Sequence, residues 1–192
     1  MAEKVLEEEK RALTSWEIMQ IAENKGYDKL VDPTPSASLG KLLDADVRDN
    51  PSTVFTACGA RRYTFILKEQ MDDIHPGKKV RILEHVIYTI DHGIGAADVV
   101  ATTGSTGTIV AYEEYRANIE GEVKRGLVIH PNHLSWVKEH IDSRTGYLIK
   151  LDEVVPPSED DYADWNTHID KLAMSFQVGA IFVIPIESFT VL

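Results

Sequence analysis

The chain has 192 residues, a net charge of −11, 43% hydrophobic residues and 27% charged residues. This balance is typical of a packed globular protein and excludes a disordered chain, and the length suits one ordinary domain or two small ones. A strongly acidic surface repels nucleic-acid phosphates and anionic lipids. The distribution of charge along the chain therefore matters more than its total.

Three further features limit the class of protein. The longest uncharged apolar stretch, at 178–186, is much shorter than the roughly 20 residues that a membrane-spanning helix needs. The charged first residues lack the apolar segment of a signal peptide. The single cysteine, Cys58, excludes an internal disulfide and a cysteine-based zinc site. We therefore expect a cytoplasmic protein that does not bind membranes.

The first part of the chain is typical of helices. Val5 and Leu6 lie in a charged helical segment. Thr14 and Glu17 have the spacing of a capping box, and Gly26 lies where a left-handed residue would end the helix. We expect one apolar face on this helix, formed by Trp16, Ile18, Met19 and Ala22. The sequence thus predicts two helices before residue 27.

A third helix and a hairpin are predicted next. Thr34 followed by Pro35 is a strong helix start. The apolar positions at helical spacing are Leu39, Leu42, Leu43 and Val47. Asn50 and Pro51 end the helix, and two β-rich runs at 54–57 and 62–67 flank a turn, as in a hairpin. The order of three helices and a hairpin predicts a winged helix.

Residues 5–68 resemble one known family. The stretches that carry the resemblance are Val5-Leu6-Glu7-Glu8-Glu9-Lys10, Leu13-Thr14, Glu17-Ile18, Lys25-Gly26-Tyr27, Thr34-Pro35, Leu39-Gly40, Asp46-Val47-Arg48-Asp49-Asn50-Pro51, Phe55, and Arg61-Arg62-Tyr63 through Leu67-Lys68. In order and spacing they resemble the HARE-HTH domain, a winged helix found in Asx-like chromatin proteins, restriction-associated proteins and the delta subunit of bacterial RNA polymerase. The bacterial restriction-associated branch is the most similar. The resemblance implies a role in restriction-modification or transcription.

The resemblance also implies where DNA would bind. In helix-turn-helix proteins the recognition helix enters the major groove, and a wing contacts the DNA backbone. Carried onto this sequence, the candidate DNA-binding residues are Thr34, Ser36, Ser38 and Lys41 at the start of the third helix, Arg61 and Arg62 in the wing, and Lys68 after it. The alternatives are that Thr34 only caps its helix, that the two arginines form a solvated turn, or that the winged helix binds a polymerase or restriction partner protein.

Charge divides the chain into two parts. Residues 1–69 carry 10 basic and 12 acidic side chains, a net charge of −2, and residues 70–192 carry 10 and 19, a net charge of −9. We expect a winged helix at 1–69, a linker at 70–79 and a second domain at 80–192. The acidity belongs mainly to the second domain, so it does not exclude DNA binding by the first.

The second domain is predicted to be a mixed α/β domain, which makes the whole chain α+β. We expect a helix at 80–91, with a strand as the alternative, then a hairpin whose strands are 98–103 and 108–112 around a Gly104 turn. Further strands are expected at 126–130, 146–151 and 180–184. Helices are expected from Pro131 and from Pro157, the latter reaching Phe176.

This order of elements vaguely resembles a restriction-endonuclease-like core, and it implies an alternative function. Asp98 begins a predicted strand, and Glu113 and Glu114 end the next one, where a nuclease would place carboxylates to hold Mg²⁺. Lys124, in Glu122-Val123-Lys124, has the spacing of the lysine that orients water. The simpler interpretation is that these are surface charges. Outside the nuclease alternative we expect no cofactor.

Histidine and cysteine offer weaker candidates. His130, His133 and His140 lie at a predicted strand–helix junction, but Asn132 explains that corner as a helix cap without a metal. We expect no metal site there. Cys58 is expected to be a buried small hydrophobic residue. The function predicted from the sequence is DNA binding by a winged helix with an acidic accessory domain, and the alternatives are a nuclease and a protein-interaction module.

Overall fold

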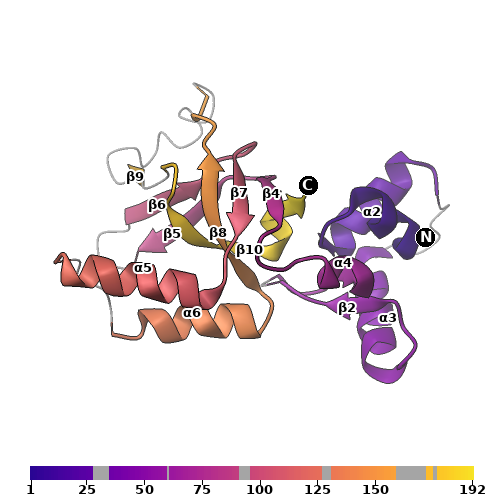
Figure 1. Ribbon diagram of the computed structural model, residues 1–192. Helices are drawn as coiled ribbons and strands as arrows, with labels where there is room; N and C mark the ends of the chain where they lie inside the picture. The colour runs from indigo at the N-terminus through magenta and orange to yellow at the C-terminus, as the bar shows by residue number, and fades with distance from the viewer. Residues whose placement is uncertain (28–34, 60, 91–95, 127–130, 159–171, 175–176) are drawn as a thin grey trace.

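The computed structural model describes residues 1–27, 35–59, 61–90, 96–126, 131–158, 172–174 and 177–192. The chain forms an N-terminal unit of helices with a small sheet, and a second unit of sheets covered by helices (Figure 1). The C-terminus lies between the two units in this view. The α+β class expected from the sequence is confirmed.

The N-terminal unit is a winged helix. Its elements are α1 (Ala2–Glu9), β1 (Leu13–Thr14), α2 (Ser15–Asn24), α3 (Pro35–Asp49), β2 (Phe55–Ala57) and β3 (Thr64–Leu67). The three strands form an antiparallel sheet in the order β1-β3-β2. The core between helices and sheet contains the fully buried Val5, Leu6, Leu13, Ile18, Ala22 and Phe65.

Helix α2 begins and ends as its sequence predicts. The Thr14 hydroxyl accepts from the Glu17 backbone N–H, and the Glu17 carboxylate accepts from the Thr14 backbone N–H, which confirms the capping box. Gly26, just beyond the helix, has a φ of +67°. Trp16 is a correction: it is 61% exposed and does not share the buried face of Ile18.

Helix α3 begins at Pro35 and ends at Asp49, as predicted. Leu39, Leu43 and Val47 pack in the core, but Leu42 is 68% exposed. The apolar spacing therefore placed Leu42 wrongly, because its position on the helix lies off the stripe that faces the core. At the end of the helix, Asp46 accepts hydrogen bonds from the side chains of Thr53 and Asn50, which fasten α3 to the start of the hairpin.

The second unit is built on an antiparallel sheet of five strands. Its strands are β4 (Lys79–Ile82), β7 (Thr106–Ile109), β8 (Gly146–Glu153), β10 (Ile181–Pro185) and β11 (Phe189–Val191), in the order β10-β8-β7-β4-β11. A second sheet contains β5 (Val86–Ile90), β6 (Ala96–Ala101) and β9 (Leu172–Met174), with β6 and β9 parallel. A short 3-10 helix, η2 (Ile186–Ser188), joins β10 to β11.

Two helices, α5 (Tyr112–Lys124) and α6 (His133–Asp142), lie side by side next to the five-stranded sheet (Figure 1). They pack on it through Tyr115 and Val137, which contact Leu148 and Val183 of the sheet in one buried cluster. Helix α6 and the strands β8 and β10 agree with the sequence prediction. No helix in the described part of the chain is long and apolar enough to cross a bilayer.

The structure corrects several predicted elements of the second unit. Residues 80–91 contain strands β4 and β5 instead of a helix, because their β-branched side chains outweigh an apolar spacing that fitted both structures. Strands β6 and β7 do not form a hairpin, since they pair in different sheets. Residues 112–124 form helix α5, and Leu172–Met174 form a strand. The strand predicted at 126–130 and most of the helix predicted from Pro157 lie outside the described residues.

The two units share a hydrophobic core. Helix α4 (Lys68–Asp72) crosses the boundary expected near residue 70, and its Met71 is buried. The shared cluster contains Ala12, Cys58, Ile66 and Met71 from the N-terminal side, and Val80, Ile82, Ile109, Ile186 and Phe189 from the second unit. The segment predicted to be a linker is therefore a packed connection, and it fixes the two units against each other.

Candidate nucleic-acid interface

The outer side of α3 carries some of the residues predicted to bind DNA. Lys41 is exposed and Ser38 is half-buried. Ser36 is also half-buried, but it lies three and four residues before Leu39 and Gly40, on the side of the helix that packs. The structure therefore puts Lys41 and Ser38, but not Ser36, on the surface that a recognition helix would offer. Thr34 lies outside the described residues.

The wing is joined to α3 by a tyrosine. Tyr63 has a φ of +59°, a backbone conformation that non-glycine residues rarely adopt. Its ring lies against Gly40, where an added Cβ would be only 2.7 Å from Tyr63 Cγ. The guanidinium carbon of Arg62 is 4.6 Å from the centre of the same ring. Arg62, Tyr63 and Gly40 therefore connect the cation of the wing to the recognition helix.

Arg61 has a different environment from Arg62. Its Nη2 donates to Glu84 Oε1 at 3.2 Å, and its Nε is 4.0 Å from Glu187 Oε1. Glu84 lies between β4 and β5, and Glu187 lies in η2, so both carboxylates belong to the second unit. Arg62, in contrast, has no ion pair among the described residues. Spacing in the sequence gave no indication of this difference.

Lys68 is exposed at the first position of α4, and its backbone N–H donates to Val54 O at 2.9 Å. Its charge also contributes to the low pKa of Asp46, which is mainly due to hydrogen bonds from Thr53 and Asn50. Lys68 therefore stands beyond the base of the wing, where strand β3 leads into α4. The structure does not place it in contact with Arg62 or Lys41.

One cation on α3 was missed by the sequence analysis. Arg48 donates from Nε and Nη2 to the two carboxylate oxygens of Asp49, and its Nη1 is 3.8 Å from Asp44. These hydrogen bonds and charges raise the pKa of Arg48 and lower that of Asp49. The Asp44–Arg48 spacing of four residues was the available signal. The outer side of α3 is consequently close to neutral, with Leu42 exposed among its charges.

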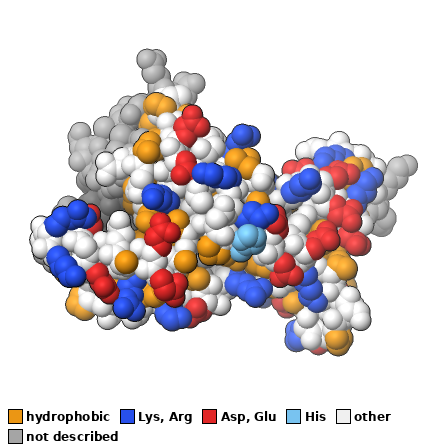
Figure 2. Space-filling model, in the orientation of Figure 1, with side chains coloured by type: hydrophobic (Ala, Val, Ile, Leu, Met, Phe, Trp, Pro, Cys, Tyr) orange, Lys and Arg blue, Asp and Glu red, His pale blue; other side chains and the backbone are white. Residues whose placement is uncertain are grey.

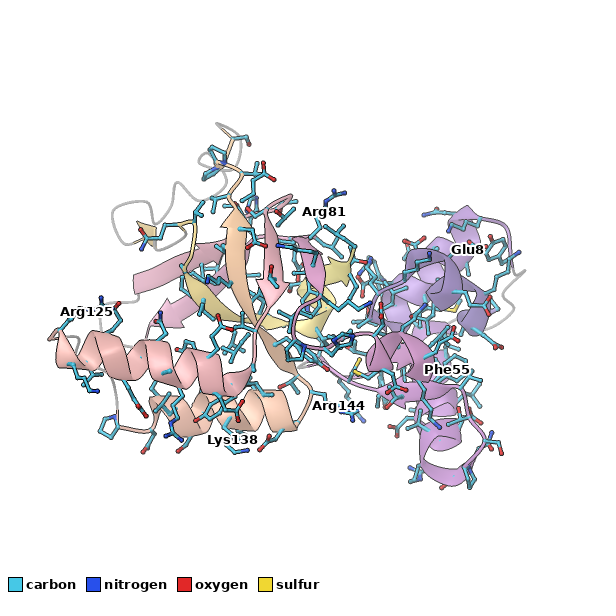
Figure 3. All side chains as sticks on the ribbon, in the orientation of Figure 1. Glu8, Phe55, Arg81, Arg125, Lys138 and Arg144 are labelled. Atoms are coloured by element: carbon cyan, nitrogen blue, oxygen red, sulfur yellow. The ribbon has the colours of Figure 1, made fainter. Side chains whose placement is uncertain are left out.

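Charge on the visible face of the molecule is mixed. Lysine, arginine, aspartate and glutamate side chains are interspersed over both units in Figure 2, with no continuous basic surface among the described residues on that face. Arg125 and Lys138, on α5 and α6, lie at the opposite end of the molecule from the winged helix (Figure 3). Phosphate contacts at the winged helix must therefore come from a few cations, which predicts weak binding without sequence recognition.

The residues of the nuclease alternative are separated. Glu113 and Glu114 lie in the first turn of α5, not at the end of a strand, and Lys124 is the last residue of that helix. Eleven residues of helix separate Glu113 from Lys124 by about 16 Å along the axis. Asp98 lies on β6, opposite Tyr88 of β5. The predicted strand positions of Glu113 and Glu114 are wrong, and the helix prevents these carboxylates from sharing a site with Lys124.

The histidine corner is an aromatic cluster. The Tyr115 hydroxyl is 2.6 Å from His133 Nε2, and the Trp136 ring stacks between His133 and His140. His130 lies outside the described residues. Among the described residues no group of three histidine, cysteine, aspartate or glutamate side chains is placed to hold a metal ion. Asn132 is the N-cap residue of α6, as expected, although its side chain makes no cap hydrogen bond.

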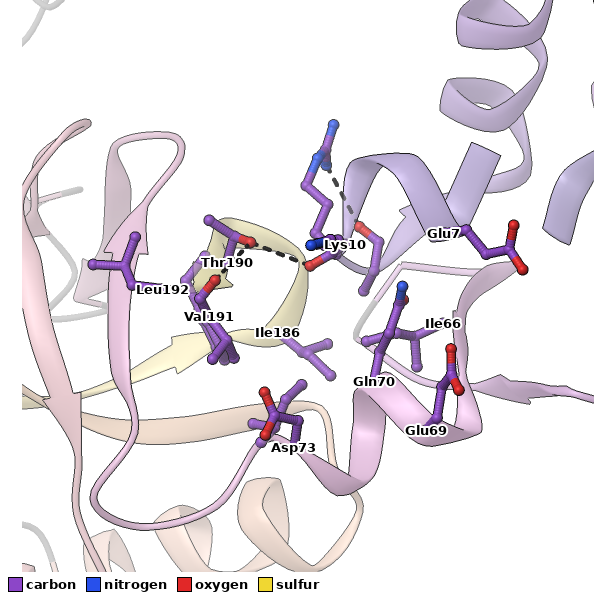
Figure 4. A pocket seen from close by; sticks show the side chains of 14 residues that line it. Glu7, Lys10, Ile66, Glu69, Gln70, Asp73, Ile186, Thr190, Val191 and Leu192 are labelled. Atoms are coloured by element: carbon purple, nitrogen blue, oxygen red, sulfur yellow. Dashed lines mark hydrogen bonds between the residues drawn. The ribbon is translucent and has the colours of Figure 1, made fainter. Parts of the chain in front are cut away.

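A cleft of about 550 Å³ lies between the two units. Thr190 of β11 donates from its hydroxyl to Lys10 O at 3.2 Å across this cleft, and Gln70, Ile186 and Asp73 line it (Figure 4). Its lining mixes cations with carboxylates and apolar side chains. The cleft therefore marks the seam between the units more than a centre with converging chemical groups.

Three helices, a three-stranded sheet and a cation-bearing wing define a winged helix-turn-helix, a class whose members bind DNA. Residues 1–64 match the family model HARE-HTH, described as a helix-turn-helix domain of ASXL and restriction endonuclease proteins, so this part of the chain is a HARE-HTH domain. The resemblance found in the sequence is confirmed for that segment. No curated protein and no solved structure matches the chain.

Proposed function

We propose that this protein binds double-stranded DNA through its HARE-HTH domain, with α3 in the major groove and the wing on the phosphate backbone. The observation that carries the proposal is the packing of Arg62 on Tyr63 and of Tyr63 on Gly40, the residue before Lys41. This packing holds a wing cation that lacks an ion pair in the described part of the chain against the recognition helix. Exposed arginine and lysine side chains are the groups that contact phosphates in such complexes.

The cellular setting follows from the family. Restriction-modification or transcription in the cytoplasm is the setting that the HARE-HTH resemblance implies, and the acidic second unit would be an accessory domain. We propose that binding needs neither a cofactor nor Mg²⁺, because the cations of the winged helix supply the phosphate contacts. Adding a chelator should therefore leave the affinity for DNA unchanged.

Fluorescence anisotropy with a labelled duplex of about 20 base pairs tests the proposal. Replacing Arg62 with alanine, and separately Lys41, should weaken binding several-fold at low salt and reduce the slope of log affinity against log salt by about 0.9 for each lost phosphate contact. The joint Arg61→Ala and Arg62→Ala variant should also weaken binding and flatten the slope. Arg125→Ala is the matched control, since this cation lies at the far end of α5. Unchanged affinity and slope in the Arg62→Ala and Lys41→Ala variants would reject DNA binding by this surface.

A protein partner is the second candidate. Trp16 and Leu42 are large apolar side chains, 61% and 68% exposed, on the two helices of the helix-turn-helix. Exposed aromatic and leucine side chains favour contact with another protein. Purified bacterial RNA polymerase is the probe that the resemblance to the delta subunit suggests. Loss of polymerase binding in Trp16→Ser and Leu42→Ser, with no DNA binding by the wild type at low salt, would favour this function.

A further inference from the structure

The wing and the second unit meet at Arg61. Its guanidinium contacts Glu84 and Glu187, two carboxylates from the second unit. Arg62, the next residue, stacks on Tyr63 of the winged helix itself. Two adjacent cations of the wing therefore differ in one respect, because Arg61 is already paired with anions from outside the HARE-HTH domain.

The two carboxylates are fixed in place by their surroundings. Ser188 donates from its hydroxyl to Glu84 Oε1 at 2.8 Å, the same oxygen that accepts from Arg61. The Glu187 side chain is only 4% exposed, and its Oε2 has no hydrogen-bond partner in the described part of the chain. Gly59 of the wing lies directly against it, since a Cβ there would be 2.9 Å from Oε2. The second unit thus presents a preformed anionic seat to the wing.

We propose that Glu84 and Glu187 compete with a DNA phosphate for Arg61, so that the second unit weakens DNA binding until a phosphate displaces them. This inference rests on the proposed DNA binding. A guanidinium pairs with carboxylate and phosphate in the same two-pronged geometry, so one anion can replace the other. The Arg61 side chain is 55% exposed, which leaves it within reach of a phosphate.

The burial of Glu187 gives the competition its direction. Among the described residues Arg61 is the cation paired with Glu187, so moving Arg61 to a phosphate leaves a buried carboxylate uncompensated. Glu84 is half-exposed, and exposed ion pairs are weak. Removing the charge of Glu84 should therefore tighten DNA binding by about two- to five-fold. Arg62 needs no such release, and Arg62→Ala should weaken binding more than Arg61→Ala.

A double-mutant cycle on the full chain tests this proposal by anisotropy with the same duplex. We would measure the wild type, Glu84→Gln, Arg61→Ala and the double variant, with Glu139→Gln on α6 as the control for net charge. Glu84→Gln should tighten binding two- to five-fold in the wild-type background and have no effect when Arg61 is alanine. Glu139→Gln should have no effect in either background.

Three results would overturn the competition. Tighter binding by Glu84→Gln that persists in the Arg61→Ala background would show a general effect of charge, and weaker binding would show that Glu84 holds Arg61 ready for DNA. Equal affinity of Glu84→Gln and wild type would also reject it, while loss of affinity in Arg62→Ala would still support DNA binding. Absence of any DNA binding by the wild type would reject both proposals.

The side-chain NMR signal of Arg61 gives an independent measurement. In the ¹⁵N-labelled full chain, adding the duplex should shift the Arg61 Nε–H resonance away from its carboxylate-paired position, and Glu84→Gln should shift it without DNA. A resonance that moves with Glu84→Gln but not with saturating duplex would show that no phosphate replaces the carboxylates, and it would overturn the proposal. Glu187→Gln extends the test if that variant folds.

Discussion

Gly40 lies where α3 and the wing meet, and its lack of a side chain allows the contact with Tyr63. A Cβ at this position would be 2.7 Å from Tyr63 Cγ and 3.0 Å from Ser15 Oγ. We predict that Gly40→Ala lowers the free energy of unfolding by about 1–3 kcal/mol, because the added methyl group overpacks this junction. It should also weaken DNA binding, because it displaces the ring under Arg62.

Gly121 provides the matched control for that substitution. It lies within α5, and the nearest atom to an added Cβ is Arg125 Nη2 at 4.0 Å. Gly121→Ala should therefore raise the free energy of unfolding by roughly 0.5–1 kcal/mol, as expected for alanine in a helix. Urea unfolding of both variants measures the two signs. Equal effects at the two positions would show that Tyr63 moves aside freely.

Cys58 is predicted to be unreactive in the folded protein. Burial, together with the negative charge of Glu187, raises the pKa of its thiol to about 12. At about pH 8 almost no thiolate is present, so a disulfide reagent should label the folded chain far more slowly than the unfolded chain. Because the pKa is higher in the folded state, this group's stabilising contribution is present below the unfolded pKa and is lost as pH rises above about 9. Fast labelling of the native protein would contradict the burial.

The capping box of α2 makes a pH-dependent contribution at the scale of one element. Partial burial acts to raise the pKa of Glu17, but hydrogen bonds from Thr14 and the charge of Arg11 hold it below its ordinary value. The pKa is therefore lower in the folded state, and the stabilisation is present above the unfolded pKa and lost as pH falls. Glu17→Gln should lower the free energy of unfolding by about 1 kcal/mol at neutral pH.

Below about pH 4 the wild type and the Glu17→Gln variant should become similar in stability. Urea unfolding at neutral pH and at about pH 3 measures both differences. The exposed Glu139→Gln substitution serves as the control, with a small effect at both pH values. A Glu17→Gln difference that is equally large in acid would show that its cause is packing and not the carboxylate charge.

Elements were predictable where the signal lies in a few neighbouring residues. The Thr14–Glu17 cap, the Pro35 start of α3 and the turn between β2 and β3 depend on local backbone chemistry, and the structure has all three. Elements whose identity depends on distant partners were not predictable. Residues 80–91 form strands because β4 pairs with β7 and β11, and β5 pairs with β6, and periodicity in one segment contains no information about these partners.

The candidate site shows the same limit at the scale of the whole molecule. The sequence identified Lys41, Arg61 and Arg62 as cations of a winged helix, because the family pattern fixes their positions. It could not show that Arg61 is paired, since Glu84 and Glu187 are 23 and 126 residues further along the chain. Counting charge by segment assigned −9 to the second unit, but only the fold shows that part of this charge lies against the wing.

The shared core predicts that the two units unfold together. Phe189 is buried in a cluster with Ile66 and Met71, so residues from both units exclude water from one another. Phe189→Ala should lower the free energy of unfolding by about 3–5 kcal/mol and destabilise both units equally. In independent domains, that substitution would affect only the second unit.

The tryptophans of the chain allow this cooperativity to be measured. Trp16 reports on the winged helix, and Trp136 reports on α6 of the second unit. In the Trp165→Phe background, replacing Trp136 or Trp16 with phenylalanine leaves one probe in each variant. The two fluorescence transitions in urea should coincide, both before and after Phe189→Ala, because a single cooperative transition gives every probe the same midpoint. Separate midpoints would show that the seam at Phe189 does not couple the units, and that the wing can leave Glu84 without unfolding the core.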